Sequence, residues 1–318
     1  MSKLLYWFLI IVMVCPFLAN VQGKAWDENT NQSIPGYVIR SSRSHPLIDM
    51  QFEFLRTTTG FNDSGEKIDY SNIYNTSSDP QRKFSIARLF LFSSITKRLG
   101  TKISIPVILR QKFDFGSVQG TNSLQNLSGD TGFGDIQIGL WYLEKLSDYS
   151  RGIVDISFTF PSGSYPLNIS ENQVSSTGRG NIVTIFRAAL DIQASKVLAI
   201  GMQGSYLVNI DDAYSLKRIN STYTLGNEVE VNGRLIIAAS NILSIGTDFQ
   251  YGEAFGDKIK GSAIPGSKSR ELIITPLIGL HVFSGSMNSD MQIGYRFCVD
   301  GKNTPRWQGL YLRNQLYF

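Results

Sequence analysis

The sequence predicts an all-β fold: a transmembrane, antiparallel, up-and-down β-barrel of about 12 strands, with short periplasmic turns and long extracellular loops. Three observations predict it. Apolar and polar residues alternate with a period of two along most of the chain, which aims successive side chains at opposite faces of a sheet. The connections between these segments alternate between short and long, which is typical of outer-membrane barrels. After residue 23, no apolar run approaches the roughly eighteen residues of a helical membrane span.

The composition fits one barrel better than the two globular domains that a length of 318 residues would suggest. Charged residues make up 18% of the chain and hydrophobic residues 42%, and the mean hydropathy is −0.06. This balance excludes intrinsic disorder and is expected when one face of each strand is apolar and the other polar. The net charge of +4 comes from 30 basic and 26 acidic side chains without a clustered basic tract, so we expect no nucleic-acid partner.

The first predicted element is a signal peptide over residues 1–23. Residues 4–23 carry no charge, and Gly23 places a small side chain at the cleavage site. An uncleaved membrane anchor is the alternative, because twenty uncharged residues could just span a bilayer. We set lipidation of Cys15 aside, since the residue before it is not small. Cleavage would leave Cys298 as a single thiol, so no internal disulfide is expected.

Residues 24–47 precede the first strand and have two interpretations. They form either a disordered periplasmic leader or a plug that folds into the lumen. A plug would bring Arg40 and Arg43 against lumen carboxylates such as Asp49 and Glu53.

Residues 48–318 form the predicted barrel. In one segment, Val154, Ile156 and Phe158 interleave with Asp155 and Ser157, so that one face is apolar and the other polar. The predicted strands, in chain order, are 48–59, 82–96, 101–116, 133–146, 150–161, 180–194, 196–210, 221–238, 241–255, 269–284, 287–298 and 305–318.

The connections follow from these strands. Short turns are predicted at 97–100, 147–149, 195, 239–240 and 285–286. Long loops are predicted at 60–81, 117–132, 162–179, 211–220, 256–268 and 299–304. An even number of strands leaves both termini on the periplasmic side. The terminal aromatic Phe318 is similar to the signal that the barrel-assembly machinery reads, so this machinery is an expected partner together with outer-membrane lipid.

The inward face of the barrel should carry the charged residues of the strands. One interpretation is a network that satisfies itself and stiffens the barrel. The other is a polar conduit whose transverse field selects solutes, and the two can coexist. The lumen-lining candidates are Asp49, Glu53, Arg110, Lys112, Asp135, Asp155, Arg187, Asp191, Glu228, Glu230, Arg234, Asp248, Asp290, Arg296 and Arg313, with the amides of Gln51 and Gln315.

Several aromatic residues fall near strand ends. Membrane girdles are one interpretation, and a stacking surface for an aromatic or fatty ligand is the other. These residues are Phe113, Phe115, Trp141, Tyr142, Tyr251, Phe255, Trp307 and Tyr317.

The sequence does not predict an enzyme. After cleavage only His45 and His281 remain, and no strand pattern places an acid and an oxyanion donor beside His281, although Ser284 and Ser286 are near it. We expect no catalytic residues, and no metal cluster or cofactor motif is found.

Four segments of the sequence resemble motifs of one protein family and occur in the same order as in that family. They are 94–107, 131–142 (TGFGDIQIGLWY), 156–163 (ISFTFPSG) and 177–180 (TGRG). The chain resembles, over about residues 82–210, the outer-membrane family named for the meta-pathway of phenol degradation. The resemblance implies an outer-membrane barrel that passes small hydrophobic compounds.

We therefore expect a channel or transporter in the outer membrane of a Gram-negative bacterium, for passive passage of small molecules, hydrophobic or aromatic ones among them. One alternative is a structural or adhesive barrel with a closed lumen that acts through loops 60–81 and 162–179. A lipid-modifying outer-membrane enzyme is the third hypothesis.

Overall fold

The computed structural model describes residues 47–74, 80–114, 127–129, 131–147, 149–163, 182–195, 197–210, 223–259, 261–284 and 287–317. The predicted signal peptide, nearly all of the segment 24–47, and Phe318 lie outside the described residues, so these expectations stay predictions. No helix among the described residues is long and apolar enough to cross a membrane.

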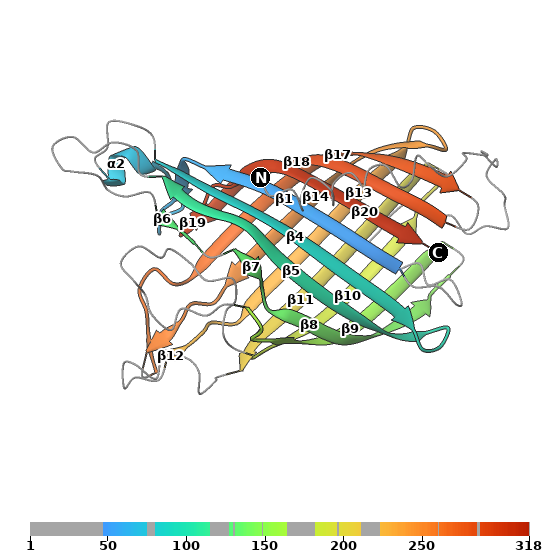
Figure 1. Ribbon diagram of the computed structural model, residues 1–318, viewed down its shortest axis with the longest axis horizontal. Coiled ribbons are helices and arrows are strands. Elements are labelled where there is room, and N and C mark those ends of the chain that lie inside the picture. Colours follow the sequence, from blue (N-terminus) through green and yellow to red (C-terminus); the bar gives the residue numbers. More distant parts are fainter. Residues whose placement is uncertain are drawn as a thin grey trace.

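Twelve long strands form one closed antiparallel sheet, as predicted (Figure 1). Each strand pairs with its neighbours in chain order, and the last pairs with the first along ten residue pairs, which closes the ring. The strands are β1 (Leu47–Thr57), β4 (Gln81–Ser94), β5 (Leu99–Asp114), β8 (Ile136–Lys145), β9 (Ser150–Phe160), β10 (Ile182–Gln193), β11 (Leu198–Ile210), β13 (Glu228–Ala238), β14 (Leu243–Ala254), β17 (Ser269–Ser284), β18 (Met287–Lys302) and β20 (Gln308–Tyr317).

The described short turns lie at one end of the barrel, and most of the smaller elements lie at the other (Figure 1). We call the first end periplasmic and the second extracellular, following the predicted orientation. The predicted loops contain pairings that periodicity did not indicate. Two three-stranded sheets, β19-β2-β3 and β12-β15-β16, join loops that are distant in sequence. The smaller elements are β2 (Thr59–Phe61), β3 (Lys67–Asp69), α2 (Tyr70–Tyr74), β6 (Leu127–Ser128), β7 (Gly132–Phe133), β12 (Tyr223–Thr224), β15 (Lys258–Ile259), β16 (Ser262–Ala263) and β19 (Thr304–Pro305). The barrel strand predicted at 221–238 begins at Glu228, because Tyr223 and Thr224 pair within a loop sheet.

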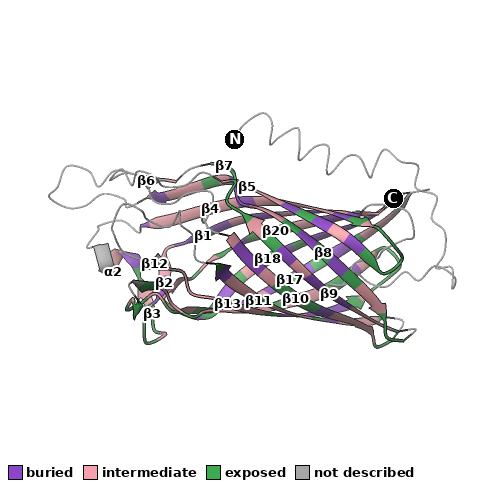
Figure 2. Ribbon diagram, turned by 90° about the horizontal axis from the view of Figure 1, so that it is seen from below, coloured by how far each residue is buried: buried purple, intermediate pink, exposed green. Residues whose placement is uncertain are grey.

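The outer surface of the barrel is apolar and the lumen wall is polar. On β9, the Val154 side chain is 54% exposed, whereas its neighbour Asp155 is only 6% exposed. Figure 2 shows this alternation along the strands of the ring. A lipid phase accommodates such an apolar exterior, and closure leaves no backbone edge that lipid would have to hydrogen-bond. The fold is thus a transmembrane β-barrel.

An apolar cluster lies on the inward face of the wall near the periplasmic end. We call it the floor cluster, and it consists of Leu47, Phe92, Trp141, Ile153 and Ala189. The indole of Trp141 is 1% exposed and donates a hydrogen bond from Nε1 to the Thr101 carbonyl at 3.0 Å. Gly100 lies opposite this ring, where an added Cβ would come within 2.2 Å of the indole. Trp141 therefore points inward, not into a membrane girdle.

Candidate functional site

A cavity of about 380 Å³ lies in the lumen next to the floor cluster. Every barrel strand except β9 contributes to its wall. The charged residues of the wall are four acids, Asp49, Glu53, Glu230 and Asp248, and six bases, Arg88, Lys102, Arg187, Arg234, Arg296 and Arg313. Eight of these ten residues are lumen candidates of the sequence analysis; Arg88 and Lys102 were missed, although their inward parity is a signal that could have found them.

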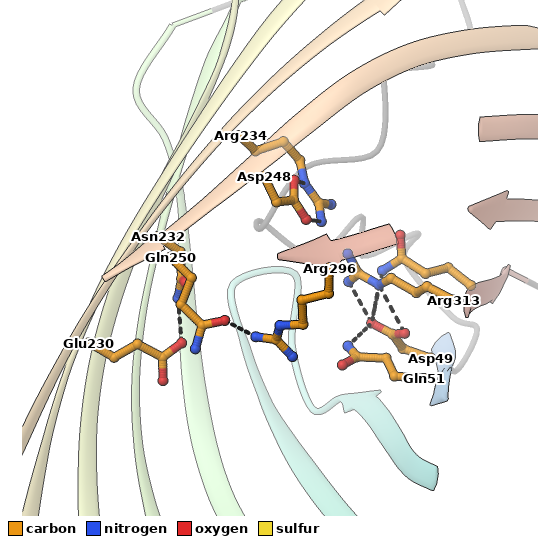
Figure 3. A network of polar contacts seen from close by, with 10 residues as sticks. Asp49, Gln51, Glu230, Asn232, Arg234, Asp248, Gln250, Arg296 and Arg313 are labelled. Carbon is orange, nitrogen blue, oxygen red and sulfur yellow. Dashed lines mark hydrogen bonds and ion pairs between the residues drawn. The ribbon is translucent and has the colours of Figure 1, made fainter. Parts of the chain in front are cut away.

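The closing seam of the barrel carries one ion pair of this wall. Arg313 on β20 holds Asp49 on β1 through Nε at 3.0 Å from both carboxylate oxygens and through Nη2 at 2.6 Å from Oδ2 (Figure 3). Gln315 and Gln51 donate to the same Oδ2 at 3.2 and 3.5 Å. Such a fork is a strong, charge-assisted arrangement, and it compensates the burial of Asp49.

Glu53 on β1 binds two guanidinium groups. Arg88 on β4 donates to its Oε1, and Arg296 on β18 donates from Nη1 to its Oε2 at 2.6 Å. Arg296 also donates from Nη2 to the Gln250 amide oxygen on β14 (Figure 3). Because β1 and β14 are four strands apart around the ring, Arg296 links two separate parts of the wall.

On β13 and β14, Arg234 and Asp248 face each other in register. Their fork joins Nε to Oδ1 at 2.6 Å and Nη2 to Oδ2 at 2.5 Å. Asn232 is the preceding inward residue of β13, and its amide donates to Glu230 Oε1 at 2.7 Å. Glu230 thus has an amide donor here, whereas the other three acids of the wall each bind a guanidinium group.

A second charged group lies on the opposite side of the ring, where Asp155 on β9 accepts from two cations. Lys102 Nζ is 2.6 Å from its Oδ1, and Arg187 Nε donates to its Oδ2. The Ser157 hydroxyl also donates to Oδ1, at 3.0 Å. Lys102 reaches β9 by crossing β8 at its register partner, Gly139. A Cβ added at Gly139 would lie 2.4 Å from the Ser157 hydroxyl, so glycine leaves the space that these contacts occupy.

Arg110 and Lys112 do not face the lumen, which corrects the prediction. Ser85 pairs with Arg110 while the next residue, Ile86, pairs with Ile108, so Leu109 is an extra residue in β5. This β-bulge reverses the alternation beyond it. Arg110 is accordingly exposed, and Lys112 forms an ion pair with Asp114, the next residue on the same face, at 3.4 Å.

Four other candidates point inward but lie outside this cavity. Asp135 accepts the backbone N–H of Gly163 at 3.0 Å, at the extracellular end. Asp191 lies opposite Arg151 in register, on the periplasmic side. Glu228 lines a second cavity, and Asp290 contacts His281.

The second cavity has a volume of about 310 Å³ and lies toward the extracellular end. It is acidic, since Glu228, Glu230, Glu253 and Glu271 contribute to its wall against the single base Arg270. Leu207, Glu230 and Gln250 line both cavities, so the two meet beside the contact between Arg296 and Gln250. The two cavities therefore follow one another along the lumen.

His281 has partners that the sequence analysis did not find. Its Nδ1 lies 2.6 Å from Asp290 Oδ1, and its Nε2 lies 3.2 Å from the Ser244 hydroxyl. The order of groups is that of a hydrolase triad. However, Ser244 is fully buried, and none of the three residues lines either of the two cavities described here. The described residues also contain no group of metal-ligating side chains.

Comparisons with known proteins place this geometry in a family. The family model described as "Putative MetA-pathway of phenol degradation" matches residues 79–313. An outer membrane channel from Pseudomonas putida F1 is similar in structure, with 15% identity, a TM-score of 0.65, and coverage of 92% of this chain and 100% of that chain. The NanC porin is less similar, with 10% identity, a TM-score of 0.44, and coverage of 85% and 98%. No match was found among curated sequences. The chain thus belongs to the family whose model it matches, and its fold is that of an outer-membrane β-barrel channel.

Proposed function

We propose that this protein is an outer-membrane channel for the passive passage of small molecules. One observation carries the proposal: two cavities follow one another inside a closed barrel whose wall is polar. A barrel that served only as a scaffold could fill its lumen with packed side chains, as twelve strands enclose a narrow interior. Family membership and the fold support the same role.

The wall chemistry narrows the class of solute. A bare hydrocarbon would remove water from ten charged side chains without replacing the lost hydrogen bonds, which is costly. A solute with a polar or ionised group can exchange those bonds one for one. We therefore favour polar or amphipathic solutes, with or without an aromatic ring, over purely hydrophobic ones.

Planar-bilayer recording tests the channel. The purified barrel should produce discrete current steps, and liposomes that contain it should swell in solutions of small sugars or amino acids. Boiled and unboiled samples should first differ in gel mobility, which shows that the barrel is folded. A folded barrel that passes neither ions nor solutes would refute the channel.

The second candidate is a structural barrel with a closed lumen. The floor cluster and the bridge that Arg296 makes between Glu53 and Gln250 favour it, since both occupy the lumen. A folded protein that shows no conductance but binds to surfaces through its loops would support this candidate. Lipid hydrolysis that is lost in His281→Ala would support a lipid-modifying enzyme, the third hypothesis, although the burial of Ser244 argues against it.

A further inference from the structure

We propose that Lys102, Arg187 and the rings of Phe90 and Phe92 form a binding site, inside the lumen, for a small monocarboxylate with an apolar body. The inference rests on the proposed channel, because the site lines the channel wall. Four observations carry it: the excess charge, an unused donor, an apolar surface beside the cations, and the size of the cavity.

The first observation is an excess of positive charge at this part of the wall. Lys102 and Arg187 are both within ion-pair distance of Asp155, and among the described residues no other carboxylate forms an ion pair with either cation. The side chain of Lys102 is 4% exposed and that of Asp155 is fully buried. Two cations against one anion leave one positive charge in a poorly hydrated place, where an anion would be favoured.

The second observation is a hydrogen-bond donor without an acceptor. Arg187 Nη2 is buried and has no hydrogen-bond partner among the described residues, although Nε of the same group binds Asp155. A buried donor that lacks an acceptor is costly, so a ligand that supplies one gains affinity. The Arg187 side chain lines the 380 Å³ cavity and is 17% exposed, so a small rotation of its guanidinium group would present Nη2 to a ligand there.

The third observation is an apolar surface next to these cations. Phe90 and Phe92 are successive inward residues of β4, with ring centroids 6.4 Å apart and planes inclined by 13°. Phe92 pairs directly with Lys102 across β4 and β5. Both rings line the same cavity as Arg187. A ligand whose carboxylate binds the cations can therefore place its apolar body against the rings.

The ligand's size and charge follow from the same cavity. A volume of about 380 Å³ is at the lower end of small-molecule sites. The single excess charge matches a monoanion, whereas a dianion would add a charge that no nearby cation compensates. The acids on the other side of the cavity, Asp49, Asp248 and Glu230, oppose a second negative charge. Benzoate has the required charge and shape and serves as the probe.

The test compares benzoate with two partial analogues in bilayers that contain the folded protein. Benzyl alcohol keeps the ring without the charge, and acetate keeps the charge without the ring. Benzoate should reduce the single-channel current at concentrations at least tenfold below either analogue. Arg187→Gln should weaken the benzoate effect roughly ten- to hundredfold, since a charge-assisted hydrogen bond is lost. Phe90→Ala should weaken the effect of benzoate but not of acetate.

Two control variants separate this site from a general effect of charge. Arg98→Gln removes an exposed guanidinium at a periplasmic turn, 62% exposed, and should leave the benzoate effect unchanged. Arg187→Lys keeps the charge and should recover most of the preference for anions. Gel mobility confirms that each variant folds. Equal effects of benzoate and benzyl alcohol on the wild type, or equal effects of Arg187→Gln and Arg98→Gln, would overturn the site.

A second measurement does not depend on conductance. Benzoate should raise the thermal unfolding temperature of the detergent-solubilised wild type, and this rise should be lost in Arg187→Gln. A folded protein without conductance, but with this rise, refutes the channel and keeps the site. A conducting protein without the rise, and without a preference for benzoate, refutes the site and keeps the channel.

Discussion

Glu53 is a buried anion that two guanidinium groups share, so its removal tests the energetics of the lumen. The side chain of Glu53 is 6% exposed, and those of Arg296 and Arg88 are 15% and 32% exposed. Glu53→Gln preserves the shape of the side chain and removes its charge. Both arginines then stay in the lumen with an amide oxygen in place of a carboxylate.

The cost follows from these contacts. Breaking a buried ion pair from one side typically costs about 3–5 kcal/mol. An interaction of about 4 kcal/mol, expected for unit charges 4 Å apart at an effective dielectric constant of about 20, agrees with that range. The amide oxygen that Glu53→Gln introduces would still accept one hydrogen bond, worth about 1 kcal/mol. The partial exposure of Arg88 reduces its share. We expect a net loss of about 2–4 kcal/mol, or roughly 30- to 1,000-fold in the unfolding equilibrium.

Reversible urea unfolding in lipid vesicles, followed by tryptophan fluorescence and gel mobility, measures this loss. The matched control is Lys67→Gln in the extracellular sheet, because Lys67 and Asp69 form a 3.6 Å ion pair whose side chains are both 51% exposed. An exposed pair of this kind contributes at most about 0.5–1 kcal/mol. A Glu53→Gln loss no larger than that of the control would refute the reasoning, since it would mean that water fills the lumen around these groups.

Three further predictions concern other parts of the barrel. Trp141→Ala should cost about 3–5 kcal/mol in the same titration and increase single-channel conductance, because it empties the centre of the floor cluster; unchanged conductance would show that the floor does not limit flow. In a variant without the native thiol, Gln111→Cys should react with a charged reagent that enters the lumen, and Arg110→Cys with a lipid-soluble one; the reverse pattern would contradict the bulge. Hydrogen bonds from Asn303 and Lys302 hold the pKa of the Asp63 carboxyl below its ordinary value, so the contact of Asn303 with Asp63 persists at neutral pH and is lost as the pH falls through that pKa. Asn303→Ala should raise the Asp63 pKa in an NMR titration, and an unchanged pKa would exclude the contact.

Sequence alternation predicted the barrel because lipid imposes a period of two on every regular strand. It oriented Asp155, Arg187, Arg234 and Asp248 toward the lumen correctly, since β9, β10, β13 and β14 contain no bulge. It failed on β5, where Val107, Ile108 and Leu109 are three consecutive apolar residues. Because all three residues are apolar, the run does not show which of them face inward. The extra residue in the bulge therefore does not interrupt the alternation, and the side chain of Arg110 is assigned to the wrong face.

The partners of the charged residues could not be predicted for a different reason. Long side chains reach over a whole neighbouring strand, as Lys102 reaches across β8 and Arg296 across β17. Strands are about 4.8 Å apart, so each such contact spans roughly 10 Å around the ring. Strand adjacency indicates only direct neighbours. The contacts of His281 have another cause, because Asp290 is its register partner on the adjacent strand β18 and Ser244 lies on the adjacent strand β14. Finding them requires the register of the strands, which alternation does not give.

The charge balance of the wall leads to one more prediction, in which two variants act in opposite directions. Six bases line the inner cavity against four acids, and Asp155 beneath it brings the acids to five, which leaves one positive charge. Glu53→Gln should raise this excess to two and increase the permeability of chloride relative to potassium, whereas Arg187→Gln should remove the excess and decrease it. Reversal potentials across a salt gradient measure both shifts. The ion pairs that stabilise the charged lumen therefore also leave this small positive excess. If the permeability of chloride relative to potassium shifted in the same direction in both variants, charges elsewhere would set the selectivity.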